Sequence, residues 1–118
     1  MTTILIQNAT IVNEGRTFIG DLLIKDECIS GIGPPGQVKI PSGTKYIDAA
    51  GFILIPGVID DHVHFRDPGL THKGDILSES RAAAAGGITS FMDMPNTVPQ
   101  AVTLKSLEDK FSIGSEKS

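Results

Sequence analysis

The sequence has one cysteine, no tryptophan and few aromatic residues, and each shortage excludes something. Cys28 is the only cysteine among 118 residues, so neither an internal disulfide nor a cysteine-based metal site can form within the chain. We expect Cys28 to be a small buried apolar residue, and the low thiol content is typical of a cytoplasmic protein. Aromatic residues make up only 5% of the chain, so we predict a core built mainly from Ile, Leu, Val and Ala.

The sequence also lacks a surplus of positive charge and any long hydrophobic run. Ten Lys and Arg stand against fourteen Asp and Glu, giving a net charge of −4. Because no basic cluster interrupts this acidity, we do not expect nucleic acid as a partner. The longest apolar stretch, Phe52–Ile59, is broken by Pro56 and Gly57, and the first residues lack a basic segment followed by an apolar one. We therefore predict neither a membrane span nor a signal peptide.

The first half of the chain, residues 1–55, reads as a small β domain. Runs of β-branched residues alternate with turn residues such as Asn13, Gly15 and Pro34. This pattern predicts a small antiparallel β unit whose strands need a partner layer, because a few short strands are not stable alone. The expected strands are Thr3–Gln7, Thr10–Asn13, Asp21–Lys25, Cys28–Gly33 and Tyr46–Ala49.

The second half, residues 56–118, predicts strands alternating with helices. Gly86 and Gly87 are suited to ending the first helix, and Thr103 is suited to capping the second. The polar stretch Ser112–Ser118 is expected to be loose. The predicted elements are a strand over Val58–Phe65, a helix from about Lys73 to Ala85, a strand over Ile88–Met94 and a helix after Thr103 with Leu104, Leu107 and Phe111 on one face.

This βαβα order indicates an α/β fold with a parallel sheet, which must be covered on both faces. Two βα units cannot provide that cover, and a (β/α)8 TIM barrel needs about 200 residues or more. We therefore predict the first two βα units of an incomplete (β/α)8 barrel. On this interpretation the sequence is the opening portion of a larger protein, or it completes its fold with other polypeptide.

His62 and His64 are the strongest chemical signal. Residues two apart on a strand point to the same side, so both imidazoles should project together at the carboxyl end of the strand. Asp60 lies on the same face. Its carboxylate is suited to hydrogen-bonding an imidazole and orienting it, without binding the metal directly. Paired imidazoles suit Zn²⁺. Two polar residues on the solvated side of an edge strand are the alternative, and the apolar run from Ile53 to Ile59 favours a buried strand and a metal.

Two further residues follow the predicted strands. Arg66 stands two residues beyond His64, where its guanidinium could bind a carboxylate in bidentate fashion. A surface arginine paired with Asp67 is an equally good interpretation of the spacing. Asn96 follows the second strand and could bind substrate, although Asn is also a common turn residue. We expect His72 to be solvent-exposed.

Another candidate, Asp93, stands on the second predicted strand. It alternates with Met92 and Met94 along the chain, so its carboxylate faces either the interior of the barrel or the helices. The sequence alone leaves these two orientations open.

Three blocks of this sequence together resemble the amidohydrolase superfamily and, within it, the dihydroorotases. The resemblance runs in order from Leu5 to about Phe111 and is specific from Phe52 to Pro99. The blocks are FILIPGVIDDHVHFRDPG (Phe52–Gly69), RAAAAGGITS (Arg81–Ser90) and MPNTVP (Met94–Pro99).

The resemblance implies a zinc-dependent cyclic amidase that interconverts N-carbamoyl-L-aspartate and L-dihydroorotate in pyrimidine biosynthesis. It implies that residues 1–55 contribute strands to a small β-sandwich, that His62 and His64 ligate Zn²⁺ in a binuclear centre of the complete protein, and that Arg66 and Asn96 bind the substrate carboxylate. The other metal ligands and the general acid/base aspartate are expected beyond residue 118. We therefore expect the 118-residue chain alone to be inactive.

Two other functions remain open at this stage. One is a non-catalytic amidohydrolase-like scaffold or assembly partner, against which the presence of all four site residues speaks. The other is a different cyclic amidase, similar to allantoinases or dihydropyrimidinases. Arg66 favours an anionic substrate, because a buried guanidinium without an anionic partner costs several kcal/mol. A homodimer is expected only by family analogy.

Overall fold

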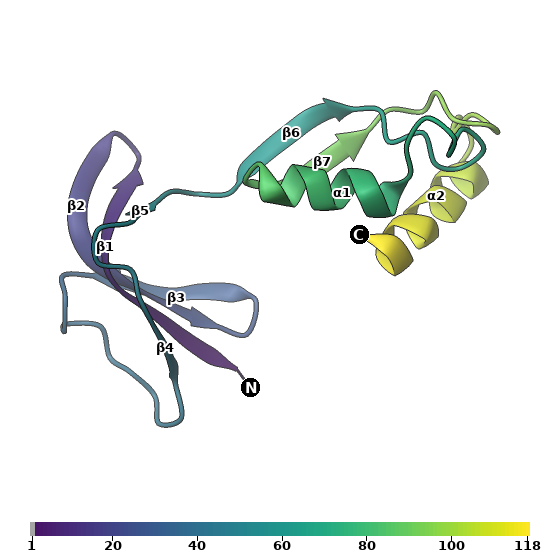
Figure 1. Ribbon diagram of the computed structural model, residues 1–118. Coiled ribbons are helices and arrows are strands. Elements are labelled where there is room, and N and C mark those ends of the chain that lie inside the picture. The colour runs from purple at the N-terminus through teal and green to yellow at the C-terminus, as the bar shows by residue number, and fades with distance from the viewer. Residues whose placement is uncertain (1) are drawn as a thin grey trace. The chain divides into compact units, whose positions relative to one another are not determined.

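The computed structural model describes residues 2–118. The chain forms two compact units (Figure 1), which meet between Pro56 and Gly57 in the sequence. Unit 1 consists of strands, and unit 2 consists of strands alternating with helices. The fold is therefore mixed α/β. No helix within residues 2–118 is long and apolar enough to cross a membrane.

Unit 1 is a five-stranded sheet centred on its first strand. β1, β2 and β3 pair antiparallel in sequence order, whereas β4 and β5 both pair with β1 in parallel. The prediction of an antiparallel unit is thus right for the first three strands and wrong for the last two, because the chain returns to the free edge of β1 in the direction of β1. The strands are β1 (Thr3–Asn13), β2 (Arg16–Lys25), β3 (Cys28–Gly33), β4 (Lys45–Asp48) and β5 (Ile53–Leu54).

A bulge interrupts β1 where the sequence suggested two separate strands. The register with β2 shifts between Ile6 and Ala9, and Asn8 adopts a left-handed backbone with φ 59°. The buried carboxylate of Asp21 accepts the N–H of Asn8 at 2.9 Å and that of Gly36 at 2.8 Å. The bulge is therefore held by a side chain from the neighbouring strand.

Small and aliphatic side chains form the core of unit 1, as the composition predicts. Ala9, Ile11 and Ala49 are buried together, and Ile6 and Leu54 pack against them. Cys28, in contrast, is exposed. The prediction of a buried cysteine is wrong because Cys28 begins the edge strand β3, whose residues are at most half-buried.

Unit 2 has the predicted βαβα order, with β6 (Val58–Val63), α1 (Ile76–Ala85), β7 (Ile88–Asp93) and α2 (Leu104–Lys117). β6 and β7 pair in parallel. Both helices lie on the same side of β7, because a cavity of about 340 Å³ is lined jointly by side chains from one face of β7 and from both helices. These side chains include Phe91 and Asp93 of β7, Ile76 of α1, and Leu107 and Phe111 of α2.

Helix caps explain where the two helices begin and end. The carboxylate of Asp75 accepts the backbone N–H of Ser78, so α1 begins after Asp75 rather than near residue 73. Gly86 caps its end, and Gly87 has φ 87°, as expected of a glycine pair. Thr103 caps α2 as predicted. The expectation of a loose tail from Ser112 is wrong, because α2 continues to Lys117, whose ammonium contacts Asp67.

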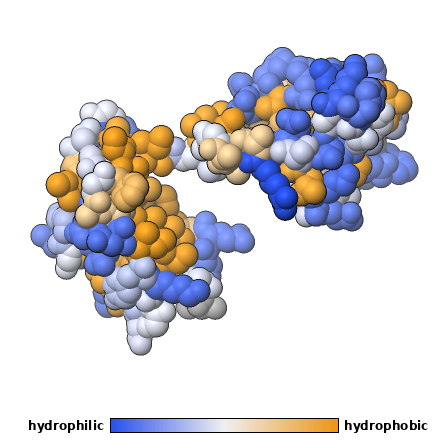
Figure 2. Space-filling view, viewed as in Figure 1, coloured by the Kyte–Doolittle hydropathy of each residue, from blue (hydrophilic) through white to orange (hydrophobic). Residues whose placement is uncertain are grey.

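The apolar strand β6 is exposed rather than buried. Ile59 is 65% exposed and Val58 is 48% exposed, and Figure 2 shows apolar side chains on the surface of both units. The prediction of a buried strand is wrong for the described residues, because β6 has one neighbouring strand and both helices of the unit lie on one face.

Candidate metal and substrate site

The two histidines lie together where β6 ends. Between the pairs Asp60–Phe91 and Val63–Asp93, β6 contains one residue more than β7, so a β-bulge falls just before the strand ends. The rings of His62 and His64 meet edge to face, with centroids 5.2 Å apart. Both side chains are exposed. The structure therefore brings the predicted pair to one side of the strand end and leaves it open to solvent.

Asn96 fixes the orientation of one of these rings. The Nδ1 atom of His64 lies 2.8 Å from Oδ1 of Asn96, which stands in the loop after β7. An amide oxygen can only accept a hydrogen bond, so Nδ1 carries the proton in this arrangement. The lone pair of the ring is then on Nε2, where a metal could use it.

Asp60 acts on the main chain rather than on a ring. Its Oδ1 accepts the backbone N–H of His62 at 3.1 Å. This short-range contact spans the bulge and fixes the backbone that carries the first histidine. The side chain that contacts an imidazole is Asn96, not Asp60.

Arg66 follows His64 in a strained backbone conformation. Its φ of 64° lies in the left-handed region, which costs a non-glycine residue about 1–3 kcal/mol and is concentrated at functional sites. Arg66 is half-buried, and the carboxylate of the adjacent Asp67 is 2.7 Å from Lys117 instead. No ion pair of Arg66 occurs within residues 2–118. The interpretation of Arg66 as a surface partner of Asp67 therefore does not describe this structure.

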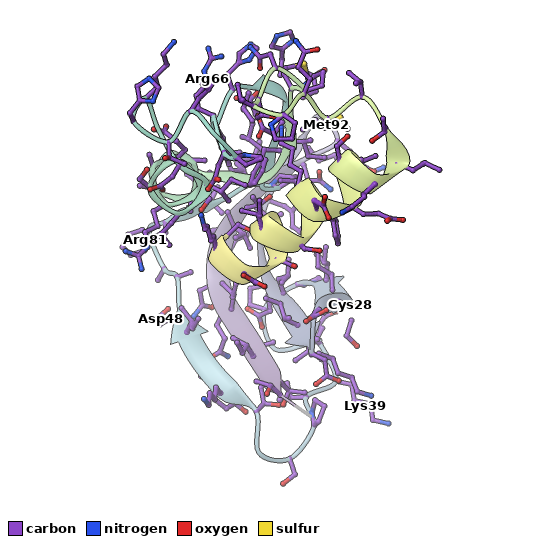
Figure 3. The ribbon with its side chains drawn as sticks, turned by 90° about the vertical axis from the view of Figure 1, so that its right-hand side faces the viewer. Cys28, Lys39, Asp48, Arg66, Arg81 and Met92 are labelled. Carbon is purple, nitrogen blue, oxygen red and sulfur yellow. The ribbon has the colours of Figure 1, made fainter. Side chains whose placement is uncertain are left out.

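The loops that carry Arg66 and Asn96 lie side by side. The N–H of Val98 donates to the carbonyl of Pro68 at 3.1 Å. Thr97, which is 2% exposed, closes its own loop by donating from Oγ1 to the carbonyl of Pro99 at 2.8 Å. Figure 3 labels Arg66 on the loop after β6, at the end of unit 2 where the chain leaves both strands. Arg66, Asn96 and the histidine pair thus share one end of the sheet.

The orientation of Asp93, which the sequence left open, is settled by its contacts. Oδ1 accepts the N–H of Phe65 at 3.0 Å. Oδ2 lies 2.9 Å from Nζ of Lys110 on α2, a charge contact whose angles differ from those of a hydrogen bond. The side chain therefore faces the helices.

Lys110 is a residue that sequence reasoning missed, and its side chain is only 8% exposed. A signal was present in the sequence. Lys110 stands three residues after Leu107 and directly before Phe111, so it lies close to the apolar face of α2.

Two residues at helix ends have shifted pKa values: Lys117 at the end of α2 and Asp75 at the start of α1. The carboxylate of Asp67 hydrogen-bonds the Lys117 ammonium and raises the pKa of that lysine. The backbone N–H of Ser78, followed by its hydroxyl, lowers the pKa of Asp75 at the start of α1. Asp67 stands one residue after Arg66, so the end of α2 is attached to the loop that follows the histidine pair.

The donor set fits part of a zinc site. Two imidazoles, one with its Nε2 lone pair available, are ordinary zinc ligands, and such sites use three or four protein ligands. Within residues 2–118 no group of three or more His, Cys, Asp or Glu side chains could hold a metal ion. The described residues therefore supply two of the ligands that a complete site requires.

Comparisons with known proteins show which family the chain resembles. The family model described as dihydro-orotase-like matches residues 51–110. A dihydroorotase from Geobacter metallireducens is 47% identical over 98 residues, which are 81% of this chain and 23% of that protein. A dihydroorotase from Citrifermentans bemidjiense is 53% identical over 79 residues, which are 67% of this chain and 18% of that protein. The chain thus spans about a quarter or less of the length of these relatives.

The solved structures of similar fold include hydantoinases. The L-hydantoinase (dihydropyrimidinase) from Arthrobacter aurescens has a TM-score of 0.85 and 31% sequence identity. The match covers 97% of this chain and 25% of that one.

Proposed function

Since the chain belongs to the dihydroorotase-like family, we propose that it forms part of a metal-dependent hydrolase that opens and closes a carboxylated cyclic amide. The proposed reaction is the interconversion of L-dihydroorotate and N-carbamoyl-L-aspartate in pyrimidine biosynthesis. The observation that carries the proposal is the pair of adjacent imidazoles, one of them held by Asn96, beside a half-buried arginine.

We place this site at the mouth of a barrel. In this proposal β6, α1, β7 and α2 are the first two βα units of a (β/α)8 barrel, and residues 1–55 contribute strands to a small β-sandwich. Parallel pairing of β6 and β7 supports this assignment. So does the position of the site residues at the carboxyl ends of both strands, where barrel enzymes carry their chemistry.

His62 and His64 are the proposed holders of a divalent cation, which we take to be Zn²⁺ in a binuclear centre. When bound, such a cation would lower the pKa of a water molecule and polarise the amide carbonyl. The chain itself holds the backbone of His62 through Asp60 and keeps the proton of His64 on Nδ1 through Asn96. The remaining ligands and the proton-transferring aspartate are expected outside residues 1–118.

Arg66 and Asn96 are the proposed binders of the substrate carboxylate. Oδ1 of Asn96 is engaged by His64, so its contribution to an anion would come from the N–H groups of Nδ2. A guanidinium supplies paired donors that match a carboxylate. Asn96 would then join the metal-binding ring to the substrate.

A neutral cyclic amide is the second candidate substrate. The specific observation in its favour is the structural similarity to the L-hydantoinase, at a TM-score of 0.85. Arg66 argues against it, because a neutral ring offers the guanidinium no anionic partner. A cytoplasmic location, supported by the low cysteine content, and a homodimer complete the proposal.

The discriminating experiment compares L-dihydroorotate with hydantoin and dihydrouracil as substrates of the complete, zinc-loaded protein that contains this chain. We expect a preference for dihydroorotate that Arg66→Ala reduces by about 100-fold, the loss of a bidentate charged contact of about 3 kcal/mol. Arg81→Ala, which removes the same charge from the exposed face of α1, is the control. An unchanged preference in Arg66→Ala would contradict the substrate assignment.

A further inference from the structure

A set of contacts from β7 holds the main chain on both sides of His64. The N–H of Met94 donates to the carbonyl of Val63 at 2.9 Å. The N–H of Phe65 donates to Oδ1 of Asp93 at 3.0 Å. His64 therefore stands between two residues that are both bound by the end of the neighbouring strand.

Lys110 connects the same strand end to α2. Its Nζ is 2.9 Å from Oδ2 of Asp93 and donates to the carbonyl of Met94 at 2.6 Å. The side chains of Asp93 and Lys110 are each only 8% exposed. The buried ammonium of Lys110 thus contacts two groups: the carboxylate of Asp93, which binds the N–H of Phe65, and the carbonyl of Met94.

These contacts connect the backbone next to His64 with the side chain of Asn96, which in turn contacts the His64 ring. Met94 stands two residues before Asn96, whose Oδ1 meets Nδ1 of His64 at 2.8 Å. The backbone on the histidine side is held by Asp93, and the backbone on the asparagine side is held by Lys110. The two side chains of the His64–Asn96 hydrogen bond are therefore placed by one ion pair.

We propose that Asp93 and Lys110 are positioning residues that set the His64–Asn96 hydrogen bond and so keep Nε2 of His64 unprotonated for a metal. Neither residue touches the imidazole, and both act through the backbone. The metal in this inference rests on the proposed function. The orientation of the His64 ring that it explains is observed within this chain.

The chemistry of the pair fits positioning better than simple packing. A buried ion pair is often no more stabilising than apolar side chains of the same volume. A carboxylate, however, has two oxygens: here Oδ1 accepts the N–H of Phe65 and Oδ2 makes the charge contact with Lys110. An ammonium carries three donors, so Lys110 can serve Asp93 and Met94 together. An apolar pair would fill the same space and fix neither backbone group.

The test is a double variant that removes both charges together, Asp93→Leu with Lys110→Met, so that no unpaired charge is left buried and the N–H of Phe65 loses its acceptor. Nitrogen-15 NMR of the histidine rings, recorded on the metal-free full chain at a pH where the rings are neutral, reports which ring nitrogen carries the proton. We expect His64 to change from the Nδ1–H form to a mixture of tautomers. The exposed His72 serves as the internal reference.

A second readout is the affinity for Co²⁺ of the complete protein that contains this chain, followed by the visible absorption of the bound ion. We expect the double variant to bind Co²⁺ about tenfold or more weakly, the usual effect of losing groups that orient a metal ligand. The matched control is Lys105→Met with Asp109→Leu, the exposed ion pair on the same helix. It removes the same two charges and should alter neither readout.

The outcomes separate the two proposals. An unchanged His64 tautomer in the folded double variant would overturn the positioning role. Should circular dichroism show the double variant to be unfolded, Lys110→Arg and Lys110→Met decide. Lys110→Arg should keep the His64 tautomer, Lys110→Met, which removes the donor to the carbonyl of Met94, should change it, and any other pattern refutes the role. A complete wild-type protein that binds no Co²⁺ would contradict the proposed function, while the tautomer measurement would still decide the positioning role.

Discussion

Each unit contains a buried aspartate that holds a strand where its pairing is irregular, and the two aspartates differ in what they connect. In unit 1, Asp21 is 1% exposed and binds the N–H groups of Asn8 and Gly36. In unit 2, Asp93 binds one N–H and one ammonium. The first carboxylate is satisfied by backbone groups alone, whereas the second is linked through Lys110 to the loop of Asn96. A buried aspartate that binds a backbone N–H thus has a structural role in unit 1, whereas in unit 2 it is connected to a candidate site.

The largest expected effect is confined to unit 2. In the complete, zinc-loaded protein, His62→Ala should lower dihydroorotate turnover by about 1000-fold or more, because one member of an interdependent catalytic set is lost. Steady-state kinetics and zinc content measure the loss. His72→Ala, a substitution in the exposed loop before α1, should keep wild-type values. Near-normal turnover in His62→Ala would remove the histidine pair from the mechanism.

Asp21→Ala tests whether the aspartate of unit 1 is purely structural. The substitution leaves two N–H groups without their acceptor, each costing about 1–3 kcal/mol, so the free energy of unfolding should fall by about 4 kcal/mol. Urea denaturation measures the change, with Glu27→Ala at an exposed position as the control. The His64 ring signals should not change while the chain is folded. A change in them would break the distinction between the two aspartates.

Two glycines with positive φ sharpen the comparison further. A Cβ at Gly69 would collide with the carbonyl of Val98, whereas a Cβ at Gly36 would meet open space. Both have left-handed backbones, with φ of 84° and 74°. Gly36→Ala should therefore cost about 1 kcal/mol, and Gly69→Ala about 3 kcal/mol, since the two site loops must also separate. Equal losses of stability in thermal unfolding would contradict the close approach of these loops.

The smallest effect expected is at the end of α2. The pKa of Lys117 is raised by Asp67, so the stabilising contact is fully present below the ordinary lysine value of 10.5. It is lost as the pH rises through the raised value. NMR signals from the last turn of α2 should shift in that alkaline range, and Lys117→Met should abolish the shift. Signals from unit 1 should remain constant.

The sequence predicted local features well. Turn residues placed the end of β2 and both boundaries of β3, although β2 begins at Arg16 rather than at Asp21. The motifs at Gly86 and Thr103 ended and began helices as expected. These features are determined by the backbone preferences of a few neighbouring residues. The α/β order of unit 2 follows from the same signals.

Features that depend on distant residues were missed. The parallel pairing of β4 and β5 with β1 depends on where the chain returns, which no local pattern encodes. The length of α2 depends partly on the contact of Lys117 with Asp67, fifty residues away in the sequence. At the site, the spacing of His62 and His64 predicted their common side. The ring contact of Asn96 and the role of Lys110 required the tertiary structure.

The parallel strands of unit 1 also bear on how the protein is made. Two consecutive hairpins join β1, β2 and β3, so these strands can pair as soon as they leave the ribosome. The other edge of β1 must wait, because Ile4 pairs with Lys45 and Thr10 with Ile53. During translation the first strand to emerge therefore keeps an open edge until Leu54 is available. Over that interval the open edge of β1, like the outer edge of β3, is available for pairing with another nascent chain.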